Sequence, residues 1–213
     1  MTPYISLEDM DNITQSILSD YEIDVENITE AIPIEEIIEF HFDLSVSWEN
    51  IDDLSQGEHV MAAIFPSEKQ IVMNENKLDL FKENEGFMNF TFAHELGHWV
   101  LHTADDTQLS FDLNSNKHVF YCRSTSKKLP VETQADMFAS SILMPKPFVV
   151  SFISDLWNQE RVQWNDLYQL CELLHVSISA LIVRLEQLKL LYVEEKKIYE
   201  SKEEAMGQAS FDF

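Results

Sequence analysis

Two histidines and a glutamate stand close together in the segment FTFAHELGHWVLH, residues 90–102. On a helix, His94 and His98 lie one turn apart and about 40° apart around the axis, so both imidazoles can reach one metal ion. Glu95 is rotated by about 100° from His94. Its carboxylate would lie beside the metal, where it can accept a proton from a bound water. This combination is typical of metal-dependent hydrolysis.

A hydrolytic zinc site needs a third protein ligand and an open fourth position. His102 is the first candidate, but on an unbroken helix it lies about 12 Å from His94 and 6 Å from His98 along the axis. The known pattern that turns the chain after the second histidine is missing, because Leu101 and Ala104 occupy the positions of its Gly and His. We therefore expect His102 to cap or pack the end of the helix.

The second candidate is Glu132, in the segment VETQAD. Residues 131–143 have apolar side chains at the spacing of a helix with one buried face. Glu132 and Asp136 lie four residues apart in this predicted helix. Two acids at the edge of such a face are explained if Glu132 is the third ligand and Asp136 accepts a hydrogen bond from a ligand histidine. The alternative is that both are ordinary solvated acids, in a chain with 38 Asp and Glu residues.

The elements that must position these residues follow from hydrophobic spacing. Helices are expected at 5–18, 33–42, 87–103 and 131–143. Two antiparallel strands, HVMAAIFP and KQIVMNEN, should be joined by a short turn, and HVFYC (118–122) should be a third strand. A polar loop, 123–130, precedes the last of these helices. The fold class is α+β, with a small antiparallel or mixed sheet on the metal-bearing helices, and Gly97 should permit close approach by a neighbouring element.

Beyond Pro147 the pattern is purely helical. Residues 164–191 predict two amphipathic helices broken at His175–Ser177, with Ser177 as the N-cap of the second, which resembles a helix-turn-helix. A DNA-binding surface should be basic, yet residues 165–190 hold two basic residues against three acids. A helical subdomain packed on the catalytic part is favoured over DNA binding.

The charge of the chain is strongly negative. It has 14 basic and 38 acidic residues, a net charge of −24, and the first 68 residues hold 17 acids and no Lys or Arg. Such a surface repels nucleic acid and attracts basic partners, although it could serve solubility alone. No signal peptide or run of about 20 apolar residues is present, and the two cysteines form no close pair, so we expect a cytoplasmic protein without membrane contact.

The two motifs together resemble the ImmA/IrrE-type zinc metallopeptidases. That family has an AHELGH helix followed by a Glu-x-x-Ala-Asn/Asp-x-Phe-Ala helix ending in Leu-Met-Pro, matched here by TFAHELGHWVLH and VETQADMFASSILMP. The resemblance covers residues 30–145 and continues more weakly to 193. It implies a gluzincin-like fold and a Zn²⁺ ion held by His94, His98 and Glu132. Glu95 is then the catalytic carboxylate, and Asp136 supports a ligand from the second shell.

Better-studied members of that family cleave helix-turn-helix repressors, so the resemblance implies an endopeptidase whose protein substrate is such a repressor. The rival interpretations are a non-catalytic protein that sequesters a repressor and a DNA-binding regulator. Asn89 stands near a position where many members have Arg, and no added sensor domain is evident. The strand KQIVMNEN is either an exposed edge where substrate adds as a further strand or an ordinary inner strand.

The resemblance and the spacing together divide the chain into four parts. We expect an N-terminal helical extension at 1–30 and a zincin-like metallopeptidase domain at 31–147. A helical, helix-turn-helix-like subdomain should follow at 148–199, and a flexible tail at 200–213.

Overall fold

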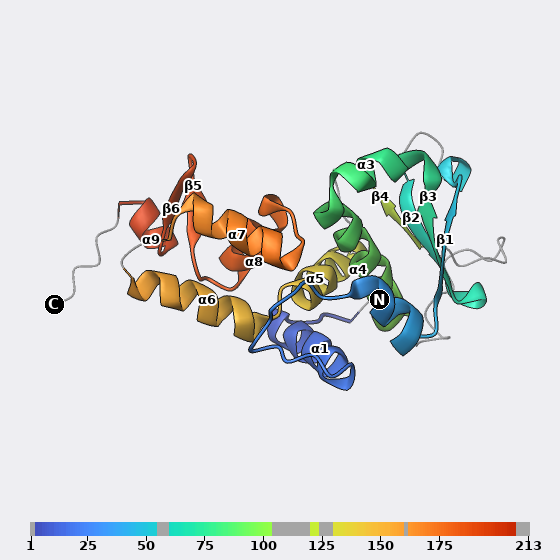
Figure 1. Ribbon diagram of the computed structural model, residues 1–213, viewed down its shortest axis with the longest axis horizontal. Coiled ribbons are helices and arrows are strands. Elements are labelled where there is room, and N and C mark those ends of the chain that lie inside the picture. Colours follow the sequence, from blue (N-terminus) through green and yellow to red (C-terminus); the bar gives the residue numbers. More distant parts are fainter. Residues whose placement is uncertain (1–2, 55–59, 104–119, 124–129, 160–161, 208–213) are drawn as a thin grey trace.

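The computed structural model describes residues 3–54, 60–103, 120–123, 130–159 and 162–207. Its architecture is α+β, as predicted: a four-stranded sheet lies at one end, and the rest of the described chain is mostly helical, with a two-stranded sheet near the C-terminal end (Figure 1). Residues 118–119, 124–129 and 208–213, which fall in the predicted third strand, polar loop and tail, lie outside the described part. The three predicted boundaries between the four parts of the chain stay predictions.

The sheet has four strands in the order β1-β3-β2-β4. Their bounds are β1 (Ser45–Glu49), β2 (Val60–Phe65), β3 (Gln70–Asn74) and β4 (Phe120–Arg123). The predicted antiparallel pairing of β2 with β3 is confirmed, with Ala63 opposite Val72. β1 was not predicted, and it pairs with β3 in parallel. The hypothesis of an exposed edge at KQIVMNEN is therefore wrong: β3 is an inner strand, and the edges are β1 and β4.

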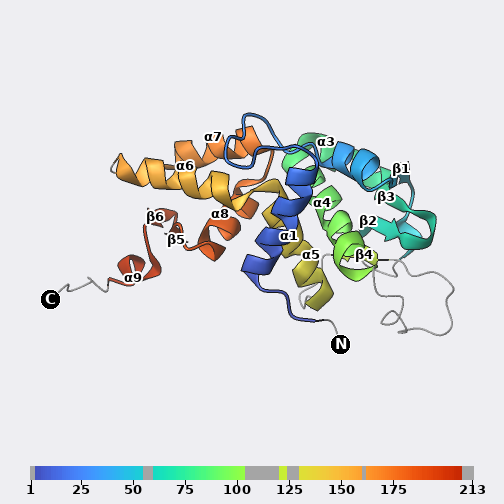
Figure 2. The same cartoon turned by 90° about the horizontal axis from the view of Figure 1, so that it is seen from below.

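The helix α4 (Glu85–His102) lies between the sheet and α5 (Pro130–Leu143), and α1 (Leu7–Asp20) packs on α5 (Figures 1 and 2). The predicted helices at 5–18, 87–103 and 131–143 are thus confirmed, with small shifts at their ends. One hydrophobic core runs through all three, and Phe92 of α4 and Phe138 of α5 are among its fully buried side chains. A smaller cluster, Ile51, Val60, Ala63 and Val72, covers the other face of the sheet.

The segment predicted as a helix at 33–42 is less regular than expected. One α-helical turn, α2 (Ile34–Glu36), continues as a π-helical turn at Ile37–His41. The π-helical turn keeps Ile37 and Ile38 in the core. The apolar residues of this segment are therefore buried, as they would be in the predicted helix. A short helix that the pattern did not indicate, α3 (Leu78–Glu83), precedes α4.

The C-terminal part contains α6 (Lys146–Asn158), α7 (Trp164–Leu174) and α8 (Ile178–Gln187). The Ser177 hydroxyl accepts a hydrogen bond from the Ala180 N–H at 3.2 Å, so the predicted N-cap is confirmed. α7 and α8 are bent by 104° relative to each other, within the range of helix-turn-helix units. Cys171 of α7 is a free, buried thiol, and burial raises its pKa to about 11.

Beyond α8 the prediction of purely helical structure is wrong. β5 (Tyr192–Glu194) and β6 (Lys197–Tyr199) form a hairpin, and a short helix, α9 (Lys202–Ala205), follows it inside the segment predicted as a flexible tail. The two turn residues Glu195 and Lys196 both have positive φ, 47° and 63°. This is the primed turn that joins two-residue hairpins.

Two of the contacts that join the helix-turn-helix-like unit to the rest of the described chain are especially close. The Arg184 guanidinium is fully buried and donates to the Asp11 carboxylate of α1 at 2.6 Å and to the Met144 carbonyl at 3.2 Å. At the start of α4, a Cβ added to Gly86 would lie 2.6 Å from the Val176 carbonyl carbon, so only glycine permits this approach. Both contacts fix the α7–α8 turn and α8 against the metal-bearing helices.

No single helix in the described ranges is long and apolar enough to cross a bilayer. Two bent pairs, α5 with α6 and α7 with α8, reach that length and apolarity only when each pair is taken together.

Candidate metal centre

The helices α4 and α5 approach each other closely at Gly97. A Cβ at this position would lie 3.1 Å from the Cβ of Phe138 and 3.2 Å from the Cα of Ala135, which is tighter than ordinary van der Waals contact. The close approach predicted for Gly97 is therefore confirmed, and its partner is α5. This spacing lets side chains one or two turns away on the two helices meet directly.

Three side chains from these helices converge on one point. The Nε2 atoms of His94 and His98 are 3.1 Å apart, and the Glu132 carboxylate oxygens lie 3.3 Å from the first and 3.6 Å from the second. These atoms form a group that could hold a metal ion. A tetrahedral zinc ion with ligands at about 2.0–2.1 Å requires ligand atoms about 3.3–3.4 Å apart. The two Nε2 atoms and the nearest Glu132 oxygen to each are close to this spacing, and one ligand atom from each of the three residues lies within 4.8 Å of the others.

Asp136 lies behind the His94 imidazole. The Nδ1 of His94 is 3.0 Å from the Asp136 carboxylate, and since an ionised carboxylate only accepts, Nδ1 carries the proton and donates. This leaves Nε2 facing the point of convergence. The structure therefore places Asp136 where the sequence predicted it, as the acceptor that orients a candidate ligand.

The three converging groups change one another's proton affinity. Burial alone would lower the pKa of His94, but its hydrogen bonds to Asp136 and Glu132 and the charge of Glu95 outweigh burial and raise the pKa to about 9. Burial lowers the pKa of His98 to about 4, against the opposing effect of Glu132. Burial would raise the pKa of Glu132, yet the hydrogen bonds from both histidines hold it well below its usual range. In the metal-free protein, a charged His94 thus lies beside an ionised Glu132.

Glu95 is fully buried on α4, next in the chain to His94, and its negative charge is one of the influences on the His94 pKa. A carboxylate in such a low-dielectric position interacts strongly with any proton or charge that comes near it. Among the described residues, the group of candidate ligands does not include Glu95, and its role beside the metal stays a prediction.

His102 points to a different target from the other two histidines. Its Nε2 lies 3.3 Å from the Val131 carbonyl oxygen in the first turn of α5, and its ring centroid is 5.5 Å from that of His98. The group of converging ligand atoms comprises His94, His98 and Glu132 without it. The expectation that His102 packs at the end of the helix agrees with this contact, but its partner on α5 was not foreseen.

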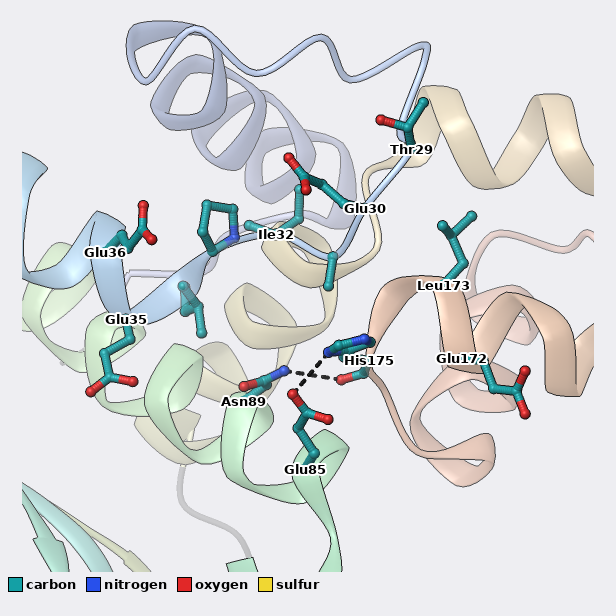
Figure 3. Close-up of a pocket in the computed structure, with 13 residues that line it drawn as sticks. Thr29, Glu30, Ile32, Glu35, Glu36, Glu85, Asn89, Glu172, Leu173 and His175 are labelled. Carbon is teal, nitrogen blue, oxygen red and sulfur yellow. Dashed lines mark hydrogen bonds and ion pairs between the residues drawn. The ribbon is translucent and has the colours of Figure 1, made fainter. Parts of the chain in front are cut away.

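A hollow that the sequence did not indicate lies beside the N-terminal half of α4, away from the converging ligand atoms (Figure 3). It has a volume of about 540 Å³ and is lined from three distant segments, with Glu30, Glu35, Glu36, Glu85 and Glu172 among the lining residues. The His175 Nδ1 is hydrogen-bonded to the Glu85 carboxylate there at 2.9 Å, and the His175 carbonyl accepts from the Asn89 side chain at 3.3 Å. Burial and the charge of Glu39 raise the pKa of Glu35. Only the fold brings these acids together, so spacing along the chain carried no signal of them.

Comparison with known proteins gives one family. The model of the IrrE N-terminal-like domain, peptidase M78, matches residues 66–186, which is more than half of the 213 residues. No curated protein matches the chain. The matched range begins at the turn between β2 and β3, includes both metal-bearing helices with all five predicted site residues, and ends in α8. The chain thus belongs to the IrrE N-terminal-like peptidase M78 family.

Proposed function

We propose that this protein is a zinc-dependent endopeptidase, with His94, His98 and Glu132 as the zinc ligands. The observation that carries the proposal is the convergence of His94, His98 and Glu132 in a chain of a peptidase family. The two Nε2 atoms are 3.1 Å apart, and each has a Glu132 carboxylate oxygen at 3.3 or 3.6 Å. Two imidazoles and one carboxylate are a donor set that zinc prefers, and three protein ligands leave the fourth position open for chemistry.

Zinc bound here would supply a Lewis acid and would lower the pKa of a bound water toward about 7. Glu95 would accept a proton from the attacking water and deliver it to the amide nitrogen as the C–N bond breaks. Asp136 would hold the His94 imidazole through Nδ1–H, so that Nε2 keeps its direction and its basicity. The burial of Glu95 keeps bulk water from competing for the proton that it transfers.

The proposed substrate is a basic protein, namely a helix-turn-helix repressor. The net charge of −24 and the acidic hollow beside α4 both support a basic partner, because opposite charge speeds encounter and like charge disfavours nucleic acid. The exposed residues of α8, which would be the recognition helix, are Ser179, Val183 and Gln187, none of them basic. Arg184 is buried against Asp11 instead. These features favour binding of a protein over binding of DNA.

Glu95→Gln tests the peptidase proposal. The variant keeps the three ligands, so it should bind zinc like the wild type while cleavage of a purified repressor falls by about 10²–10⁴-fold, the usual contribution of a general base. Glu83→Gln, at an exposed position on α3, is the matched control and should cleave normally. Cleavage is followed by mass spectrometry of the products, and bound metal by elemental analysis after mild purification.

The same variant separates the rival interpretations. If Glu95→Gln still relieves repression normally in cells, the protein acts by sequestering its partner and the peptidase proposal is wrong. Tight, sequence-specific DNA binding by the pure protein at physiological salt would favour a DNA-binding regulator instead. A metal other than zinc in the mildly purified protein would overturn the choice of ion.

A further inference from the structure

The contact between His102 and Val131 joins the end of α4 to the beginning of α5. A carbonyl oxygen can only accept, so the His102 Nε2 at 3.3 Å must carry the proton and donate it. Burial lowers the pKa of His102, which keeps the imidazole neutral at neutral pH. A backbone carbonyl has two lone pairs and can take this side-chain donor in addition to a helical N–H.

The acceptor is the residue immediately before the candidate zinc ligand Glu132. α5 begins at Pro130, so Val131 and Glu132 belong to its first turn, where helices fray most easily. The Glu132 side chain, 19% exposed, bridges the Nε2 atoms of His94 and His98. Any loosening of this turn moves the carboxylate away from the two imidazoles, which are fixed in the middle of the buried α4.

Other side-chain hydrogen bonds reach α5 at different places. Asp136, one turn after Glu132, accepts from the His94 Nδ1 at 3.0 Å. Arg184 donates to the Met144 carbonyl just beyond its C-terminal end, about 18 Å along the axis from Glu132. Gln134 donates to the Pro3 carbonyl at 2.6 Å. The side chain of Gln134 is two positions, about 200°, from that of Glu132, on the side of α5 turned away from it. These contacts hold α5 as a whole, while the His102 contact acts on the turn that presents the ligand.

We propose that His102 is a positioning residue of the metal centre: by donating to the Val131 carbonyl, it fixes the first turn of α5 and so sets the Glu132 carboxylate at the ion. The inference rests on the proposed role of Glu132 as a zinc ligand. Three histidines at successive turns of α4 then have two tasks. His94 and His98 bind the ion, and His102 holds the helix that brings the third ligand.

Two substitutions in the full chain test this role by zinc affinity, measured in competition with a chromophoric chelator. His102→Leu removes the donor, and affinity should fall by about 10–100-fold, the usual effect of losing a group that orients a ligand. His102→Gln places an amide N–H where the imidazole Nε2–H was, so it should restore affinity to within about threefold of the wild type. The visible spectrum of the Co²⁺-substituted protein should change in the Leu variant and return in the Gln variant.

Ile142→Val is the control, because it loosens the packing of α5 far from its first turn. It should leave zinc affinity within about twofold of the wild type, even if the melting temperature falls as much as in His102→Leu. The proposal is wrong if His102→Leu binds zinc like the wild type, or if the control weakens binding equally. It is also wrong if a folded His102→Gln is as weak as the Leu variant, since the imidazole itself would then be needed.

The outcome is separable from that of the peptidase proposal. A wild-type chain that binds zinc tightly but cleaves no protein would refute the peptidase proposal. The role of His102 would still be decided by the zinc affinities of its Leu and Gln variants. A wild-type chain with no measurable affinity for zinc would overturn both.

Discussion

Zinc binding at this centre should release about one proton from His94. The pKa of this imidazole is raised to about 9, because its hydrogen bonds to Asp136 and Glu132 outweigh the effect of burial. At pH 7 about 99% of it is then charged, and zinc binds only the neutral form. His98, with a pKa of about 4, and Glu132, with a lowered pKa, have no proton to lose at that pH. An ordinary histidine would release only about 0.2 of a proton.

Isothermal titration calorimetry measures this number directly. Zinc is titrated into the metal-free protein at pH 7 in two non-chelating buffers of different ionisation enthalpy, and the difference in heat gives the protons released. Asp136→Asn removes the negative charge that favours the charged imidazole and leaves only a neutral amide acceptor, so the release should fall toward the value for an ordinary histidine. Asp155→Asn removes the same charge from an exposed position on α6 and should release as much as the wild type.

A water that ionises on the bound zinc adds to the release in every one of these proteins, so the difference between them is the informative quantity. Equal release from the wild type and from Asp136→Asn would refute the reasoning, because it would mean that Asp136 does not hold His94 in its charged form. A wild-type release near 0.2 would refute it as well.

Three further predictions concern the stability of the fold. Gly97→Ala forces α4 and α5 apart and should cost about 1–3 kcal/mol in urea unfolding, together with weaker zinc binding; unchanged values would mean that α5 yields easily. Arg184→Met removes the 2.6 Å donor of the buried Asp11 carboxylate and leaves only the Lys146 ammonium at 4.0 Å, so it should cost about 3–5 kcal/mol, whereas Arg184→Met with Asp11→Asn should recover much of the loss. The raised pKa of His94 stabilises the metal-free protein fully below about pH 6.5, and this stabilisation is lost as the pH rises through about 9. The melting temperature in chelator should therefore fall over that window by more in the wild type than in His94→Asn.

Much of the candidate centre could be predicted from the sequence because its geometry is mostly helical. The spacing of His94 and His98 fixes their common side of a helix wherever that helix packs. Glu132 lies 34 residues beyond His98, and the sequence indicated it through a second four-residue spacing and a family resemblance. The spacing of residues along the chain could not predict the distance between α4 and α5. That distance depends on Gly97 meeting Ala135 and Phe138, a contact that exists only in the folded chain.

The strands were predicted less well, because their pairing is set by distant residues. β1 has no clear alternation of apolar and polar side chains, and its residues are exposed or only partly buried. It becomes a strand by pairing in parallel with β3, with Ser45 opposite Gln70. The same pairing turns β3 from a possible edge into an inner strand. The hairpin of β5 and β6 was missed since its turn uses Glu195 and Lys196 in place of the usual Asn and Gly.

The C-terminal helices show how tertiary contacts change the meaning of a local pattern. From the sequence alone, Arg184 and Lys189 are the two basic residues between 165 and 190 that DNA could contact. The fold turns Arg184 inward to Asp11, 173 residues earlier in the chain, so the helix-turn-helix shape remains while half of its positive charge is lost to the core. The same guanidinium holds the Met144 carbonyl just beyond the end of α5. This helix pair therefore supports the helix that carries Glu132, which gives a physical reason for the family match to extend from the metal centre into α8.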